Sequence, residues 1–498
     1  MSAVATAENT PCVMLGQCLL LALRENHAFR LMKQMAVKIN NGKIALDRNA
    51  LSVLDLLIAG MSYMAPGYCL FFTTAVIAGF AGVHIPLIFL FAGLGILCTG
   101  TALAQLSTIA PSAGSLQVFI DRGFGRIVSN TCGLILVVGY LLLQVAGTVL
   151  LGGWTATLLQ EYLGVSLPWP ILAVISVAVC TCLMIVGVGL SIRATWVLFL
   201  VEFAIVLIIS CATLFQGGAS GLAYQPFDFE SMTALPPSAI AFGIVFATYS
   251  FVGFEGAIAF AEETAEPKRS LPIAVIGGIV AIALLYILAT YSVVVGFGVD
   301  KMDQVAKDPE PISTLTRMYA SPLVGLLKLA IWTSIIASFL AGCNANARIL
   351  FNMGRERMLP EVLGYVHPRF KTPVVALVTS MALTAAIAPL AALFWDYLAG
   401  FGNIAGLGAL LVLLIYMIAT VALPAHVLRS GQSLAKRPLS YVVIPVLGAA
   451  IWLFPLWGVL QPGQPFPFSI YPAVTFVLIV LAIAIALFRR NKLAKPAT

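Results

Sequence analysis

Twelve apolar stretches follow one another along the chain, each about as long as a helix needs to be to cross a lipid bilayer. About 20 helical residues span the ~30 Å hydrocarbon core, because each residue adds about 1.5 Å. Only 9% of the side chains are charged, too few to cover a globular protein of 498 residues. The sequence therefore predicts an all-α integral membrane protein. The stretches are 51–81, 85–108, 126–154, 168–188, 194–216, 236–261, 271–298, 323–352, 373–393, 398–423, 440–460 and 467–488.

The basic residues are distributed unevenly between the two sides of these stretches. Of the 27 Lys and Arg, 23 lie before the first span, in alternate loops or in the C-terminal tail. The opposite loops carry only Lys301, Lys307 and Arg317, and Lys328 lies near the start of the eighth span. Cytoplasmic loops of membrane proteins are enriched in Lys and Arg. We therefore expect both termini in the cytoplasm, a location in the plasma membrane, and lipid rather than nucleic acid as the partner behind the net charge of +7.

The stretches define a simple domain organisation. We expect one membrane domain between a cytoplasmic N-terminal extension and a short cytoplasmic tail. The apolar run at 12–23 is too short to span and lacks a cleavage site of small residues, so we expect no signal peptide. The predicted units are the extension 1–48, the membrane domain 49–488 with spans 1–5 in 51–216, spans 6–10 in 236–423 and spans 11–12 in 440–488, and the tail 489–498.

The first span contains the interruption "SYMAPGY", residues 62 to 68. Pro66 removes one backbone donor and disfavours helical geometry in the residue before it. Hydrocarbon cannot satisfy the backbone groups that such a break exposes. Either the break is a kink for packing, or the exposed groups face something other than lipid.

A second interruption, "YSFVGFEG" at 249–256, places glycines around Glu255 in the sixth span. If ten of the twelve spans form two repeats of five, the interrupted spans are the first of each repeat. Paired interruptions at corresponding positions indicate the binding site of an inverted-repeat transporter. We therefore predict that both breaks face a central cavity and its substrate.

Three segments carry a family resemblance. The run "FVGFEGAIAFAEETAEPKRSLPIAV" (251–275) resembles the sixth span and following segment of the amino acid–polyamine–organocation (APC) superfamily. The run "NANARILFNMGRERMLPEVLGYVHPRFKTPVVAL" (344–377) resembles its eighth span and loop, and "APSAGSLQVFIDRGFG" (110–125) resembles the Pro-x-x-Gly start of its third span. The resemblance extends from about residue 50 to the C-terminus.

The resemblance implies a specific fold and activity. We expect a LeuT-like five-plus-five inverted repeat with helices 1 and 6 broken and two extra C-terminal helices. Such proteins move amino acids, amines or polyamines by alternating access, and many relatives are proton symporters or exchangers.

The resemblance also implies which residues of the first interruption bind substrate. In amino acid carriers this turn is often rich in glycine, so that backbone N–H groups at a half-helix N-terminus hold the substrate carboxylate. This chain has Ala65, Pro66 and Gly67 there, and only Gly67 and Tyr68 can still donate. A hydroxyl of Ser62, Tyr63 or Tyr68 would then compensate for the missing donor.

The second interruption offers acceptors for a substrate ammonium group. Its unwound carbonyls would face the amine, and Phe251 and Phe254 would close over it, because an aromatic face attracts a cation. Ordinary helix packing is the alternative for the two phenylalanines. The candidate residues of this segment are Tyr249, Ser250, Phe251, Val252, Gly253 and Phe254.

Two carboxylates within spans are candidates for gating or proton coupling, because ionisable groups at membrane depth are costly. Glu255 matches a glutamate that the arginine–agmatine exchanger branch connects with gating and pH response; a structural hydrogen bond to span one is the alternative. Glu202 falls where several proton-coupled relatives carry a lysine. It either carries a proton or pairs with a base such as Lys328.

Three polar residues lie where the eighth span meets the cytoplasm. We expect Asn344, Asn346 and Arg348 to anchor the following loop and to close an inner gate with the acidic run 262–266. A simple positive-inside anchor is the alternative for the arginine.

Catalytic and metal-binding patterns are absent from the sequence. The four histidines are far apart, no His, Cys or carboxylate cluster has metal spacing, and no nucleophile elbow or phosphate-binding motif occurs. We expect no metal, no cofactor and no enzymatic activity. The predicted function is a secondary active permease for amino acids, proton-coupled or exchanging. A polyamine or simple amine carrier is the alternative that Pro66 favours. A membrane nutrient sensor is a remote one, for which the 50-residue head and residues 489–498 leave no room for a signalling domain.

Overall fold

The computed structural model describes residues 38–40, 43–45, 52–109, 116–186, 192–219, 221–263, 266–367 and 372–493. Most of the predicted extension 1–48, the segment 110–115 and the last residues of the predicted tail lie outside this part of the chain. The regular elements of the described residues are helices, apart from a short antiparallel hairpin of β1 (Lys38–Asn40) and β2 (Lys43–Ala45).

Ten helical segments of the described chain are long and apolar enough to cross a membrane. The protein is therefore a multi-pass membrane protein. Val53–Ile109 is one apolar segment of 57 residues, and Trp169–Ile185 is a shorter apolar helix. The count of twelve spans, the inverted repeat and the domain boundaries stay predictions.

The long helices are connected by short helical turns. The principal helices are α3 (Val53–Met64), α4 (Pro66–Ala81), α5 (Ile85–Ile109), α7 (Arg126–Leu163), α8 (Trp169–Val186), α9 (Ile192–Phe215), α11 (Pro237–Tyr249), α12 (Pro267–Phe297), α15 (Val324–Arg355), α16 (Val374–Ile387), α17 (Tyr397–Arg429), α18 (Ile444–Val459) and α19 (Tyr471–Leu493). The shorter elements are η1 (Gly82–His84), α6 (Leu116–Phe124), η2 (Gln225–Phe227), α10 (Phe229–Thr233), η3 (Phe254–Glu263), η4 (Val299–Lys301), α13 (Met302–Lys307), α14 (Pro311–Tyr319), η5 (Ser321–Leu323), η6 (Glu361–Gly364), η7 (Ala388–Leu393), η8 (Leu434–Lys436), η9 (Leu439–Val443) and η10 (Phe468–Ile470).

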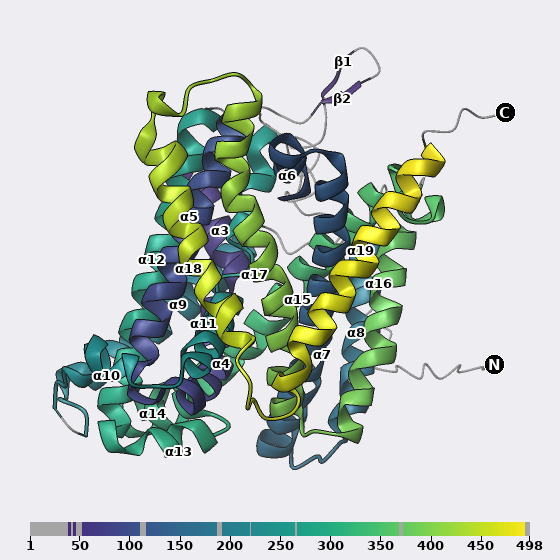
Figure 1. The fold of residues 1–498 in the computed structure, drawn as a ribbon. Coiled ribbons are helices and arrows are strands. Elements are labelled where there is room, and N and C mark those ends of the chain that lie inside the picture. The colour runs from purple at the N-terminus through teal and green to yellow at the C-terminus, as the bar shows by residue number, and fades with distance from the viewer. Residues whose placement is uncertain are drawn as a thin grey trace, which may run out of the picture.

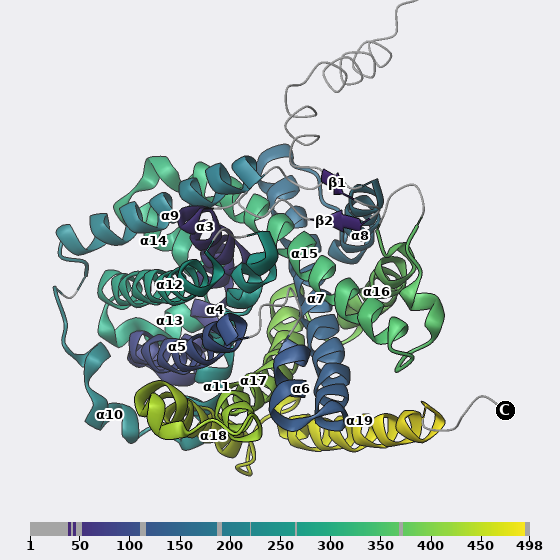
Figure 2. The same cartoon turned by 90° about the horizontal axis from the view of Figure 1, so that it is seen from above.

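The long helices form one bundle, with α6, the hairpin and the C-terminal end of α19 at one end and α10, α13 and α14 at the other (Figure 1). Seen along the bundle, α4, α11 and α17 are central and α19 lies at the edge (Figure 2). Burial agrees with this arrangement: 78% of the most apolar stretch in Pro237–Ile258 is buried, against 17% in Phe468–Arg489. The two interrupted segments therefore lie in the protein interior, away from lipid.

The first interruption separates α3 from α4 at a single residue. Ala65 adopts the left-handed conformation with φ 43° and ψ 65°, and its N–H donates to the Ser62 carbonyl at 3.2 Å. Pro66 is then the first residue of α4, where a helix needs no N–H from it. The break therefore leaves no missing hydrogen bond at the proline, and the N-terminal end of α4 points into the bundle.

The second interruption ends α11 at Tyr249, and the chain continues through a tight turn into η3. Gly253 has φ 107°, a conformation that L side chains rarely adopt, and an added Cβ would lie 2.8 Å from the carbonyl oxygen of Tyr63. The Tyr68 and Tyr249 hydroxyls are 2.7 Å apart. The two interruptions therefore pack directly against each other.

Replacing Gly253 by alanine should destabilise the protein and abolish uptake. Positive φ costs an L residue about 1–2 kcal/mol, and the added methyl group also contacts the Tyr63 carbonyl. The measurement is the midpoint of thermal unfolding of the purified protein, followed by transport in proteoliposomes. For the unfolding midpoint, Gly342→Ala is the matched control, because nothing lies within 4 Å of an added Cβ on this helical glycine. Equal midpoints for the two variants would contradict the packing described here.

Candidate functional site

A cavity of about 750 Å³ lies beside the two interruptions and extends along α15. Its volume lies in the range of ~300–1,000 Å³ typical of small-molecule sites. At one end it is lined by Tyr63 and Gly253 of the interruptions. At the other end it is lined by Asn352 in the last turn of α15 and by Val366 and Thr372, which follow that helix in the chain. The cavity therefore connects the interruptions with the end of the bundle that carries α6 and η6.

Six predicted site residues line this cavity, and eight do not. The lining residues are Tyr63, Tyr68, Tyr249, Val252, Gly253 and Glu255. The residues that do not line it are Ser62, Ala65, Pro66, Gly67, Ser250, Phe251, Phe254 and Glu202. In this structure the wall of the cavity thus comes from one side of each interruption.

Phe251 and Phe254 take part in packing in this structure. Phe251 is fully buried, with its ring centroid 5.1 Å from that of Tyr286, and Phe254 packs on Tyr416 at 5.2 Å. The Ser62 hydroxyl donates to the Ile58 carbonyl at 2.7 Å, within its own helix. None of the three therefore presents a free group to the cavity.

Glu202 of α9 lies at the N-terminal end of α4. The Gly67 N–H donates to Oε1 of Glu202, and the Ser334 hydroxyl donates to the same oxygen at 2.8 Å. An anion is favourable at a helix N-terminus. The sequence predicted that the N–H groups of Gly67 and Tyr68 bind the substrate. The Gly67 N–H instead binds a carboxylate of the protein itself.

Lys328, the base considered as a partner for Glu202, binds elsewhere. Its Nζ pairs with Glu161 of α7 and, at 2.9 Å, with Glu310. The pairing of Glu202 with Lys328 was therefore a wrong alternative. Sequence reasoning missed both partners, because Glu161 is 167 residues away in the chain and Glu310 lies outside the predicted spans, just before α14.

The Lys328 ion pairs lie next to a group of aromatic rings. The Nζ atom is 5.7 Å from the centroid of the Trp154 ring, and Trp154 packs against Phe71 and Phe72 of α4. None of these side chains lines the cavity. Phe71 and Phe72 follow Tyr68 along α4, so the aromatic group and the ion pairs close the cavity towards the end of the bundle that carries α13 and α14 (Figure 1).

The carbonyls of the second interruption have partners within the chain. The Tyr286 hydroxyl donates to the Ser250 carbonyl at 2.7 Å. The Tyr249 carbonyl accepts the Val252 N–H at 3.1 Å. These acceptors are satisfied by the protein in this conformation.

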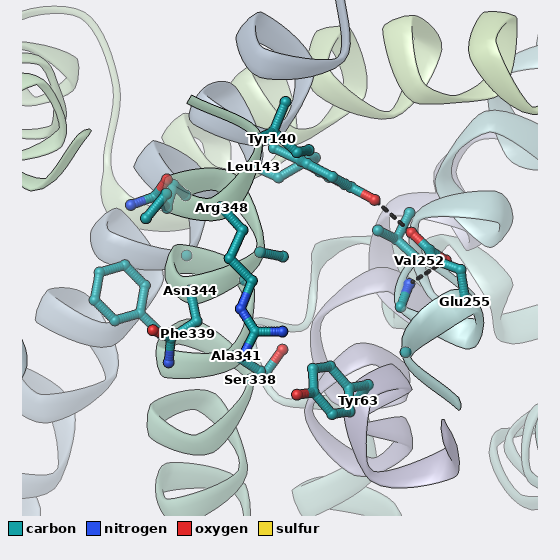
Figure 3. Close-up of a pocket in the computed structure, with 18 of the residues that line it drawn as sticks. Tyr63, Tyr140, Leu143, Val252, Glu255, Ser338, Phe339, Ala341, Asn344 and Arg348 are labelled. Atoms are coloured by element: carbon teal, nitrogen blue, oxygen red, sulfur yellow. Dashed lines mark hydrogen bonds between the residues drawn. The ribbon is translucent and has the colours of Figure 1, made fainter. Parts of the chain in front are cut away.

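Glu255 faces the cavity and is held by three donors. The Tyr140 hydroxyl of α7 donates to Oε1, and the Gly253 N–H donates to Oε2 at 3.3 Å (Figure 3). The Tyr416 hydroxyl of α17 donates to Oε2 at 3.1 Å. Charge-assisted hydrogen bonds of this kind stabilise a carboxylate in its ionised form. Glu255 therefore ties the turn to α7 and α17 rather than to span one.

The three polar residues predicted on the eighth span separate in the structure. Asn344 and Arg348, four residues apart on α15, both face the cavity (Figure 3). Asn346 is fully buried, and its amide nitrogen donates to Gln144 at 2.9 Å. Arg348 makes no ion pair within the described residues, and of the predicted acidic run only the side chain of Glu266 is described, which is exposed. The helical spacing of residues 344 and 348 was the signal that could have separated them from Asn346.

Comparison with known proteins identifies the family of this polytopic membrane protein. The profile of the amino acid permease family matches residues 56–492, so the chain belongs to that family, within the APC superfamily of transporters. Sequence reasoning predicted this membership, and the match confirms it.

Curated relatives within the family have different substrates in their names. The chain is 26% identical to the branched-chain amino acid permease BcaP of Bacillus subtilis over 86% of its own length and 91% of that protein. It is also 26% identical to the low-affinity putrescine importer PlaP of Escherichia coli, over 83% and 90% of the two chains. Cationic amino acid transporter 9 of Arabidopsis thaliana is 25% identical over 67% of this chain and 60% of its own.

Replacing Tyr140 by phenylalanine should lower stability only while residue 255 is ionisable. The variant leaves a buried carboxylate short of a donor, at a cost of about 1–3 kcal/mol. In a Glu255→Gln background the loss should shrink, because the amide carries no charge. The measurement is a double-mutant cycle in thermal unfolding. Tyr291→Phe, which removes a hydrogen bond to the Ala223 carbonyl away from the site, is the control. The same loss for Tyr140→Phe in both backgrounds would rule out a charge-dependent role.

Proposed function

We propose that the protein is a secondary active transporter that moves an amino acid across the plasma membrane by alternating access. The cavity beside the two interruptions carries this proposal, because residues of both interruptions line a space large enough for a small solute. The proposal includes the twelve-span five-plus-five arrangement within residues 49–488 and cytoplasmic termini. Membership of a transporter family supports it.

The two ends of the cavity differ in a way that alternating access requires. The lining reaches Thr372 and Val366 at one end. At the other end Lys328, only 1% exposed, is fixed between Glu161 and Glu310. With the proposed orientation the structure is inward-facing, and opening to the outside would separate this ion pair cluster.

Glu202 is the proposed site of proton coupling. It is 6% exposed, and Oε1 receives both the Gly67 N–H and the Ser334 hydroxyl, so its charge state acts directly on the N-terminal end of α4. Protonation would weaken both hydrogen bonds, because they lose their charge assistance. A single group would then link a proton to the position of a broken helix.

A simple amine or diamine carrier is the second candidate, and one observation favours it. The Gly67 N–H is bound to Glu202, so the N-terminal end of α4 has fewer free donors for a substrate carboxylate than the sequence suggested. The putrescine importer among the relatives is as similar to this chain as the branched-chain permease is.

Thermal unfolding in the presence of candidate solutes tests the proposed function. A ligand that binds only the folded state stabilises it by ~2.7 kcal/mol at about 100 times its Kd. We expect branched-chain or cationic amino acids to raise the unfolding midpoint and to accumulate in proteoliposomes. A panel in which neither amino acids nor amines raise the midpoint or accumulate would refute the proposal.

Glu202→Gln should abolish uptake that is driven by a pH gradient while counterflow exchange survives. Glutamine keeps an oxygen acceptor for Gly67 and Ser334, so the fold is retained, but it cannot release a proton. The measurement compares the two transport modes in the same proteoliposomes. Ser334→Ala is the companion variant, because it removes a hydrogen bond but leaves a titratable carboxylate and should keep pH-driven uptake. Loss of both modes in Glu202→Gln would assign the residue a structural role instead.

A further inference from the structure

The cavity has an uneven distribution of charge. Among the described residues that line it, Arg348 is the only basic one and Glu255 the only acidic one. Glu255 already has three hydrogen-bond donors from the protein. Arg348 has neither an ion pair nor a hydrogen bond within the described chain, and its side chain is exposed on the cavity wall. Among the described residues, Arg348 is therefore the one cation of the cavity, and none of them pairs with it.

The position of the Arg348 side chain suits a ligand in the cavity. Arg348 extends along α15 towards Ser338, and the hydroxyl of Tyr63 points to the same space (Figure 3). Neither the Tyr63 hydroxyl nor the guanidinium group has a hydrogen-bond partner among the described residues. Glu255 lies across the cavity from Arg348, on the same side as the Tyr63 ring, which packs against Gly253 and Gly256 (Figure 3). The guanidinium group of Arg348 thus faces a carboxylate across the cavity, and the Tyr63 hydroxyl points into the space next to Arg348.

The alternative anion site at the N-terminal end of α4 is already occupied. Pro66 has no N–H, and the Gly67 N–H donates to Glu202. A Cβ added to Gly67 would collide with the same Glu202 oxygen, so the carboxylate fills the space next to this donor. A substrate carboxylate cannot reach the Gly67 N–H unless Glu202 leaves.

We propose that Arg348 binds the carboxylate of the transported solute and so selects amino acids over the corresponding amines. The inference rests on the proposed function and assigns its substrate class. Guanidinium binds carboxylate through two parallel hydrogen bonds, and the Tyr63 hydroxyl adds a third donor. The substrate ammonium group then lies towards Glu255. A diamine would instead bring a second positive charge up to Arg348.

Competition between amino acids and their decarboxylated amines tests this assignment. The probes are leucine with 3-methylbutylamine and ornithine with putrescine, each competing for uptake of labelled leucine or ornithine in proteoliposomes. In the unmodified protein we expect the amino acid to compete at least tenfold better than its amine. In Arg348→Gln that advantage should disappear, with little change for the amine, and in Arg348→Glu putrescine should gain at least tenfold over ornithine.

A second arginine of the same helix is the matched control. Arg355 lies two turns beyond Arg348, stacks 5.6 Å from the Phe351 ring centroid and does not line the cavity. Arg355→Gln should keep the amino acid preference. Binding of the amine to each variant, measured by thermal shift, shows that the variant is folded.

Three outcomes would overturn the inference. If the amine competes better in the unmodified protein, the assignment is wrong while transport itself stands. If Arg348→Gln weakens the amino acid and the amine equally, the residue has a structural role and does not read the carboxylate. If no probe is accumulated or bound, the proposed function fails as well.

Discussion

No water is present in the hydrocarbon core to receive a free backbone N–H or C=O, so an interrupted helix must find its partners within the protein. Most features of this site follow from how the chain meets that requirement. Pro66 begins α4 where no N–H is needed, Glu202 accepts the next one, and Tyr286 donates to the carbonyl of Ser250. The interruptions are thus stabilised by side chains from other spans, and their freed groups are largely used before any substrate arrives.

The partners chosen for this purpose connect the site to the rest of the bundle. Glu202 joins α4 to α9 and α15, and Glu255 joins the second interruption to α7 and α17. Any movement of the half-helices must break or carry along these contacts. The Lys328 ion pairs hold α7 and α15 together at the far end of the cavity. The hydrogen bonds that stabilise the interrupted helices therefore also couple the interruptions to movements that open the cavity to either side of the membrane.

Hydropathy, charge distribution and motifs were sufficient to predict the membrane class and the family, and both are confirmed. They could not predict which side of each interruption faces the cavity. Phe251 and Val252 are neighbours in the chain, but only Val252 lines the cavity, because the turn at Gly253 decides the direction of each side chain. The hydrogen bond between Glu202 and the Gly67 N–H could not be predicted either, because the two residues are 135 positions apart in the chain. The position of Arg348 in the cavity could have been predicted, because residues 344 and 348 are about one helical turn apart in the sequence.

We propose that the cavity beside the interruptions is the substrate site and that Glu202, not the substrate, occupies the N-terminal end of α4. A cryo-electron microscopy structure in lipid nanodiscs, with the amino acid that stabilises the protein most, tests it directly. The account predicts ligand density between Tyr63, Gly253 and Arg348, with Glu202 still bound to the Gly67 N–H. Ligand density at the Gly67 N–H with Glu202 displaced, or a cavity without ligand, would contradict it.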